Sequence, residues 1–202
     1  TNQKAQAKAF YEPYAKATGS KVVPGEYNGE QAKIKAMVEA GAVAWDVVDV
    51  EYDWALQAGA QGLLEPLDFA VIDKSKLDPR FVSDYAVGSF YYSFVLGWNP
   101  ANFPDAQPAT LADLFDTAKF PGKRTFYKWS APGVIEAALL ADGVAPDALY
   151  PLDLDRAFAK LDTIKGDIIW WEGGAQSQQL LASGEAPIGF FWNGRLSALQ
   201  AD

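Results

Sequence analysis

Side chains that could bind a ligand follow the ends of four predicted strands. In an open α/β sheet, ligands bind outside the carboxyl ends of the strands, so these positions are candidates for a site. Carboxylates there could accept hydrogen bonds from a cationic group, and aromatic rings could attract the same charge. The candidates at the four ends are Glu51, Tyr52, Asp53, Trp129, Ser130, Glu172, Trp192 and Asn193.

Two of these ends carry acidic residues, and each allows two interpretations. Glu51 and Asp53 follow a short strand at 46–50, and both could face a cleft and bind an ammonium group. Acidic residues are also favoured at a helix N-terminus, which would explain the pair without a ligand. Glu172 precedes two glycines and a predicted helix. That pattern fits either an anion-binding helix start or an ordinary tight turn.

Tryptophan stands at the other two ends. Trp129 and Trp192 lie at the mouths of their strands, where a large ring must cover either a ligand or the core. Each ring alone fits core packing. Four ends that all deliver an aromatic or carboxylate side chain favour one shared site. We assign Trp45, Trp54 and Trp170 to packing.

Residue types that the chain lacks exclude most catalytic chemistry. The sequence contains no histidine and no cysteine. It therefore has no Ser-His-Asp triad, no cysteine nucleophile, no disulfide and no metal site built on His or Cys. Glu51 and Glu172 could form the carboxylate pair of a glycosidase, but this needs a separation that the sequence does not fix. We expect no catalytic activity, no metal and no cofactor.

Length and charge narrow the class of partner. The chain has 202 residues, half of them hydrophobic and 21% charged, which is typical of one large globular domain or two small ones. Its net charge of −9 would repel a phosphate backbone, so nucleic acid is not an expected partner. The same acidic balance suits a cationic ligand.

Alternating strand and helix patterns predict an α/β fold with a largely parallel sheet. The predicted strands are at 21–27, 46–50, 90–100, 124–129, 167–171 and 187–192. The predicted helices are at 3–17, 30–40, 133–141, 153–164, 175–183 and 195–201, with one more that begins after a cap at Thr110. Folds of this class usually begin with a strand, whereas a helix comes first here, so we expect that the given sequence lacks the N-terminal strand.

Two further signals concern boundaries and faces. Pro100, Pro104 and Pro108 lie in a polar stretch that is the best candidate boundary between two lobes. The helix at 153–164 is amphipathic. Its expected buried face is formed by Leu154, Ala157, Phe158 and Leu161.

Five motifs occur in a characteristic order along nearly the whole chain. They are Asp46–Val50, Leu96–Asn99, Pro132–Leu140, Trp170–Ser177 and Phe191–Gly194. Together they resemble the bacterial extracytoplasmic solute-binding proteins of ABC importers, in the branch that includes spermidine/putrescine-binding proteins. The resemblance adds Gln176, within the fourth motif, to the expected ligand-binding residues.

The resemblance implies an α/β, two-lobed fold of the periplasmic-binding-protein type II class, with mixed sheets flanked by helices and an incomplete first lobe. It places the first lobe at 1–95, a hinge crossing at 96–100 and the second lobe at 101–202. It also implies a periplasmic location, a membrane permease as partner and a monomer, with association if the chain is truncated.

The resemblance further implies a small, polyamine-like cationic solute, with Trp192 as a stacking ring. Two departures from the polyamine pattern stand out: Glu51 and Asp53 replace a Ser and a Tyr, and 129–133 carries no acidic residue. An anionic or zwitterionic solute, held at the helix starts after Glu172 and near Ser130, is the alternative within the family. A carboxylate glycosidase is the alternative outside it.

Overall fold

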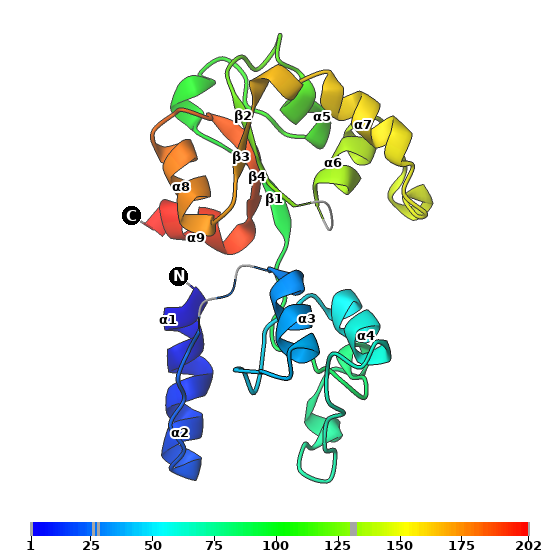
Figure 1. The fold of residues 1–202 in the computed structure, drawn as a ribbon. Coiled ribbons are helices and arrows are strands. Elements are labelled where there is room, and N and C mark those ends of the chain that lie inside the picture. Colours follow the sequence, from blue (N-terminus) through cyan, green and yellow to red (C-terminus); the bar gives the residue numbers. More distant parts are fainter. Residues whose placement is uncertain (1, 26, 28, 130–132, 202) are drawn as a thin grey trace. The chain divides into compact units, whose positions relative to one another are not determined.

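The computed structural model describes every residue except 1, 26, 28, 130–132 and 202. It divides the chain into two compact units (Figure 1): a first unit, Asn2–Tyr91, and a second unit that begins at Tyr92. The division falls slightly before the crossing segment expected at 96–100. Among the described residues, no helix combines the length and the apolar character that a membrane span requires.

The second unit is built on a mixed four-stranded sheet. Its strands are β1 (Phe94–Trp98), β2 (Arg124–Tyr127), β3 (Ile168–Trp171) and β4 (Ile188–Trp192), in the order β1-β4-β2-β3. β2 runs parallel to both β3 and β4, and β1 runs antiparallel to β4. The carboxyl ends of β2, β3 and β4 therefore lie at one edge of the sheet, as the alternating pattern predicted.

Helices cover both faces of this sheet (Figure 1). α5 (Leu111–Phe115), α6 (Val134–Ala141) and α7 (Leu154–Asp162) lie on one side, and α8 (Gly174–Ala182) and α9 (Asn193–Ala201) on the other. A continuous cluster of buried side chains joins α5, α6 and α7 to the sheet, with Phe126, Leu139 and Ile188 at most 1% exposed. The cap expected at Thr110 is confirmed, because its hydroxyl accepts the Asp113 N–H in a reciprocal capping box.

A buried arginine fixes the chain before β2. The Arg124 side chain is fully buried, and its guanidinium donates only to backbone carbonyls. The acceptors are the carbonyls of Leu114 at 3.0 Å, Asp116 at 2.9 Å and Gly122 at 2.6 Å, together with that of Phe120. Desolvation lowers the pKa of Arg124, and the attraction of the Asp167 and Asp116 carboxylates offsets only part of this effect.

The first unit is helical. A continuous helical segment comprises α1 (Asn2–Gln6), a π-helical turn (Ala7–Tyr11) and α2 (Glu12–Thr18), and α3 (Gln31–Glu39) and α4 (Tyr52–Ala60) follow. The helices predicted at 3–17 and 30–40 are thus confirmed. The strands predicted at 21–27 and 46–50 are wrong for the described residues, where the only bridge pairs Val82 with Val87. A β-branched run becomes a strand only when another strand accepts its hydrogen bonds.

Two predictions in the second unit need correction. The strand expected at 90–100 is limited to Phe94–Trp98, the segment that pairs with β4. Of the expected buried face of α7, Ala157 and Leu161 are buried, but Leu154 is 50% and Phe158 56% exposed. α7 packs against α6, and of these four side chains those of Ala157 and Leu161 belong to the buried core.

Candidate functional site

Aromatic rings gather at the carboxyl edge of β2, β3 and β4. Tyr127, Trp171 and Trp192 come from these three strands and contact one another. The Tyr127 and Trp171 rings stack with centroids 4.4 Å apart, and Trp192 meets both edge-on at 4.9 and 4.8 Å. The indole N–H groups of Trp171 and Trp192 have no acceptor in the described part of the chain. Trp171 is fully buried, and Tyr127 and Trp192 are partly buried against it, so the cluster also forms part of the packed interior of the second unit.

Trp129 extends the same cluster. Its ring stacks on Tyr127 with centroids 5.7 Å apart and planes within 3° of parallel. The structure therefore brings Trp129 and Trp192, both expected site residues, against one shared tyrosine. Ser130, the next expected residue, lies outside the described residues.

Glu172 and Gln176 lie beside this edge, and both are engaged within the protein. One Glu172 carboxylate oxygen pairs with Lys128 Nζ at 2.7 Å, and both side chains are mostly exposed. The Gln176 side-chain oxygen accepts the backbone N–H of Glu172 at 2.9 Å. An ammonium ligand at Glu172 would therefore compete with Lys128.

Asn193 links β4 to the segment that precedes β1. Its side-chain oxygen accepts the Ser93 N–H at 3.1 Å, and its own N–H donates to the Ser93 carbonyl at 2.9 Å. The two bonds fix where the chain enters the second unit. The side-chain oxygen of Asn193 is occupied by the backbone, so its role as a ligand contact stays a prediction.

The remaining expected residues belong to the first unit. Glu51 immediately precedes α4, Tyr52 is its first residue, and Asp53 lies in its first turn. Tyr52 also packs edge-on against Phe81 with ring centroids 5.3 Å apart. The helix-terminus interpretation of the two acids thus describes their local positions. Their convergence with the second-unit residues on one ligand stays a prediction.

Sequence reasoning missed a cation at the same edge. Arg195 lies in the first turn of α9, three residues after the end of β4, and its guanidinium packs against Gly174 at the start of α8. Its Nη1 donates to the Gln178 side-chain oxygen at 3.4 Å. Arg195 forms no ion pair with another described residue. The cations that do form ion pairs are Lys35, Lys76, Arg80, Lys119, Lys123, Lys128, Arg156, Lys160 and Lys165. Its position just after a strand end, in a chain with net charge −9, was the available signal.

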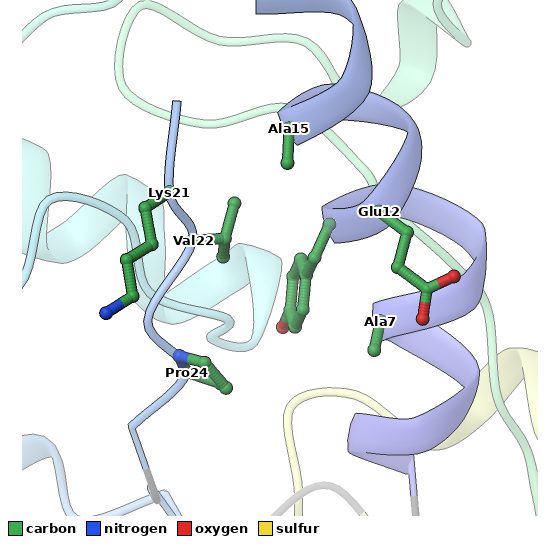
Figure 2. Close-up of a pocket in the computed structure, with 7 residues that line it drawn as sticks. Ala7, Glu12, Ala15, Lys21, Val22 and Pro24 are labelled. Atoms are coloured by element: carbon green, nitrogen blue, oxygen red, sulfur yellow. The ribbon is translucent and has the colours of Figure 1, made fainter. Parts of the chain in front are cut away.

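A pocket of about 300 Å³ lies elsewhere, within the first unit (Figure 2). The helical segment at the start of this unit and the segment that follows α2 line this pocket with Ala7, Tyr11, Glu12, Ala15, Lys21, Val22 and Pro24. The lining is mainly apolar and includes none of the expected ligand-binding residues. Across the described residues, no group of three or more His, Cys, Asp or Glu side chains is placed to hold a metal ion.

Known proteins resemble this chain over almost its whole length. Residues 9–202 match the family model described as bacterial extracellular solute-binding protein. The chain is 42% identical over 204 residues to the gamma-aminobutyric acid-binding protein of Pseudomonas aeruginosa strain PAO1, covering 98% of this chain and 57% of that relative. It thus spans about three fifths of the length of this relative.

Solved structures give the same picture. The structure described as the Atu4243-GABA receptor has a TM-score of 0.88 and 68% identity, and that of AgtB from A. tumefaciens R10 with agropinic acid has 0.85 and 39%. Each match covers 98% of this chain and 62% of the other. These matches confirm the expected periplasmic-binding-protein-like fold. A spermidine/putrescine-binding protein of Streptococcus pneumoniae is 16% identical with a TM-score of 0.67, which shows the fold alone and leaves the polyamine prediction unsupported.

Proposed function

The chain belongs to the bacterial extracellular solute-binding proteins, and from that premise we propose that it captures a small zwitterion with an amine and a carboxylate, such as γ-aminobutyrate (GABA). In this role it would deliver the solute outside the cytoplasm to the membrane permease of an ABC importer, without catalysis. The names of two relatives, at 42% and 68% identity, support GABA as the first ligand to test.

Arg195 is the observation that carries the choice of a carboxylate. Its guanidinium lies at the edge of the sheet where ligands of open α/β folds bind, and no ion pair in the described residues neutralises it. Arginine binds carboxylates through short, charge-assisted hydrogen bonds. The first turn of α8 adds positive potential beside it, which would oppose a purely cationic ligand.

The aromatic cluster would receive the amine end of such a ligand. Trp129 and Trp192 both contact Tyr127 within one group of rings. An ammonium group over a ring face gains about 0.5–2 kcal/mol through cation–π attraction. Glu51 and Asp53 remain proposed ligand-binding residues of the first unit. Glu172 is less suited because Lys128 already neutralises it.

Calorimetric titration of the full-length protein tests the proposal with three probes. GABA carries both charges, putrescine carries two positive charges and butyrate carries one negative charge. We expect micromolar affinity for GABA, about −8 kcal/mol, and binding at least about 100-fold weaker for the other two. Putrescine or spermidine binding as tightly as GABA would overturn the proposal in favour of a polyamine.

A variant pair tests the residue that the proposal depends on. Arg195→Gln should weaken GABA binding by about 100-fold, since it removes the charge-assisted bonds to the carboxylate. Arg156→Gln is the matched control. Arg156 lies on the exposed side of α7 and pairs with Asp142 at 2.7 Å, so its loss should leave GABA affinity unchanged. Equal affinities in the two variants would contradict the role of Arg195.

A further inference from the structure

Gly174 leaves the space that the Arg195 side chain occupies. A Cβ atom added at Gly174 would lie 2.1 Å from Nε and 2.5 Å from Cζ of Arg195, far inside van der Waals contact. Gly174 is absent from the glycines with positive φ, so its backbone conformation is open to any residue. Space for the guanidinium is therefore the structural reason for a glycine at this position.

Gln178 holds the same arginine from one turn further along α8. Its side-chain oxygen accepts from Arg195 Nη1 at 3.4 Å, and its Nε2 donates to the Arg195 backbone carbonyl at 3.1 Å. Because Gln178 is neutral, it orients the guanidinium without cancelling its charge. A glutamate there would form an ion pair with Arg195 and compete with a ligand carboxylate.

The other three arginines of the chain are satisfied differently. Arg80 and Arg156 pair with Asp78 and Asp142, and Arg124 donates to backbone carbonyls. Within the described residues, Arg195 is the arginine whose guanidinium has only a neutral amide as its hydrogen-bond partner. Its setting orients the charge and leaves it available.

We propose that Gly174 and Gln178 are positioning residues, which hold the Arg195 guanidinium where it can bind the ligand carboxylate. They thereby set the selectivity for carboxylate-bearing solutes. This inference rests on the proposed function and names the residues that tune it. Gly174 acts by having no side chain, and Gln178 acts by being uncharged.

Gly174→Ala in the full-length protein is the first test. The added methyl meets the far end of a flexible side chain, so Arg195 can move aside and the thermal midpoint should stay within about 2 °C of the parent. GABA affinity should fall by at least about tenfold, because the guanidinium leaves its binding position. Gly166→Ala is the matched control, since a Cβ at Gly166 meets nothing within 4 Å.

The decisive readout is selectivity. The ratio of the Kd for 4-aminobutanamide, which lacks the negative charge, to the Kd for GABA reports the carboxylate contact alone. In Gly174→Ala this ratio should fall by about tenfold, whereas a merely structural defect would weaken both ligands alike and preserve it. Gln178→Glu should lower the same ratio because the glutamate would neutralise Arg195. This variant tests the positioning of Arg195 without a change at Gly174.

The outcomes separate the two proposals. If the parent protein binds GABA and both variants keep its Kd within twofold, the positioning role of Gly174 and Gln178 is wrong and the proposed function stands. The positioning role is also wrong if both ligands bind more weakly and the ratio of their Kd values is unchanged. A parent protein that binds neither GABA nor another amino acid overturns both the proposed function and the positioning role.

Discussion

The two units differ in how far their apolar residues are buried. The second unit surrounds a four-stranded sheet with helices on both faces and a continuous core. In the first unit, Val23 is 74%, Val71 81% and Val47 90% exposed. Both units contain short runs of β-branched or aromatic residues, which favour strands. The runs at 21–27 and 46–50 pair with no strand within the described residues, so Val23 and Val47 stay exposed.

Removal of the buried Arg124 guanidinium should produce the largest difference in stability between a variant of the second unit and a variant of the first. Arg124→Met leaves the carbonyls that Arg124 satisfies without donors inside the second unit. We expect a loss of about 3–5 kcal/mol in the free energy of unfolding, measured by urea titration. Arg80→Met in the first unit serves as the control, because Arg80 is an exposed ion-pair partner. A similar loss in both variants would contradict the contrast between the units.

The next largest difference between the two units should be in the hydrogen-exchange rates of their backbone amides. Backbone amides of β4 pair with β1 and β2, whereas the run 46–50 forms no ladder in the described chain. Amides in the middle of β4 should exchange at least about 100-fold more slowly than those of 46–50 in the 202-residue chain. Comparable protection would mean that 46–50 pairs in solution.

Helix capping gives a contrast of intermediate size. α5 and α7 of the second unit have side-chain caps at Thr110 and Asp153, whereas α8 of the same unit and α3 and α4 of the first unit begin without one. Thr110→Ala should cost about 1 kcal/mol of stability in thermal unfolding. Thr110→Ser keeps the hydroxyl and should retain most of that stability. If Ser and Ala lose equally, the cap is not the source.

The smallest expected effect is a dependence of stability on pH, and one carboxyl group in each unit contributes to it. Arg80 holds the pKa of Asp78 below its ordinary value through side-chain hydrogen bonds, with Tyr91 adding to the shift, and Arg156 does the same for Asp142 in the second unit. A carboxyl whose pKa is lowered on folding stabilises the protein above its ordinary pKa near 4, and this contribution is lost as the pH falls through the lowered pKa.

Asp78→Asn and Asp142→Asn should therefore narrow their stability gap to the parent as the pH is lowered from 6 to 2. Urea midpoints across this range provide the measurement. Both carboxyl groups are solvent-accessible, so the gap should be small in each unit. A gap that widens on acidification would contradict the assigned sign.

Local signals in the sequence predicted much of the second unit. The strands near 124–127, 168–171 and 188–192 and the cap at Thr110 follow from β-branched or aromatic runs and from side-chain chemistry within a few residues. The edge at which Trp129 and Trp192 meet Tyr127 followed from the rule for parallel strands. These predictions depended on interactions between residues that are close together in the sequence, so they could be made from the sequence alone.

The sequence by itself determined the α/β class, the exclusion of histidine and cysteine chemistry, and the segments that could supply a ligand site. Tertiary structure decided which charges remain available. Lys128 neutralises Glu172, whereas Arg195 meets only a neutral amide beside Gly174. Whether a charge is neutralised depends on distances between residues far apart in the chain, and composition does not contain those distances.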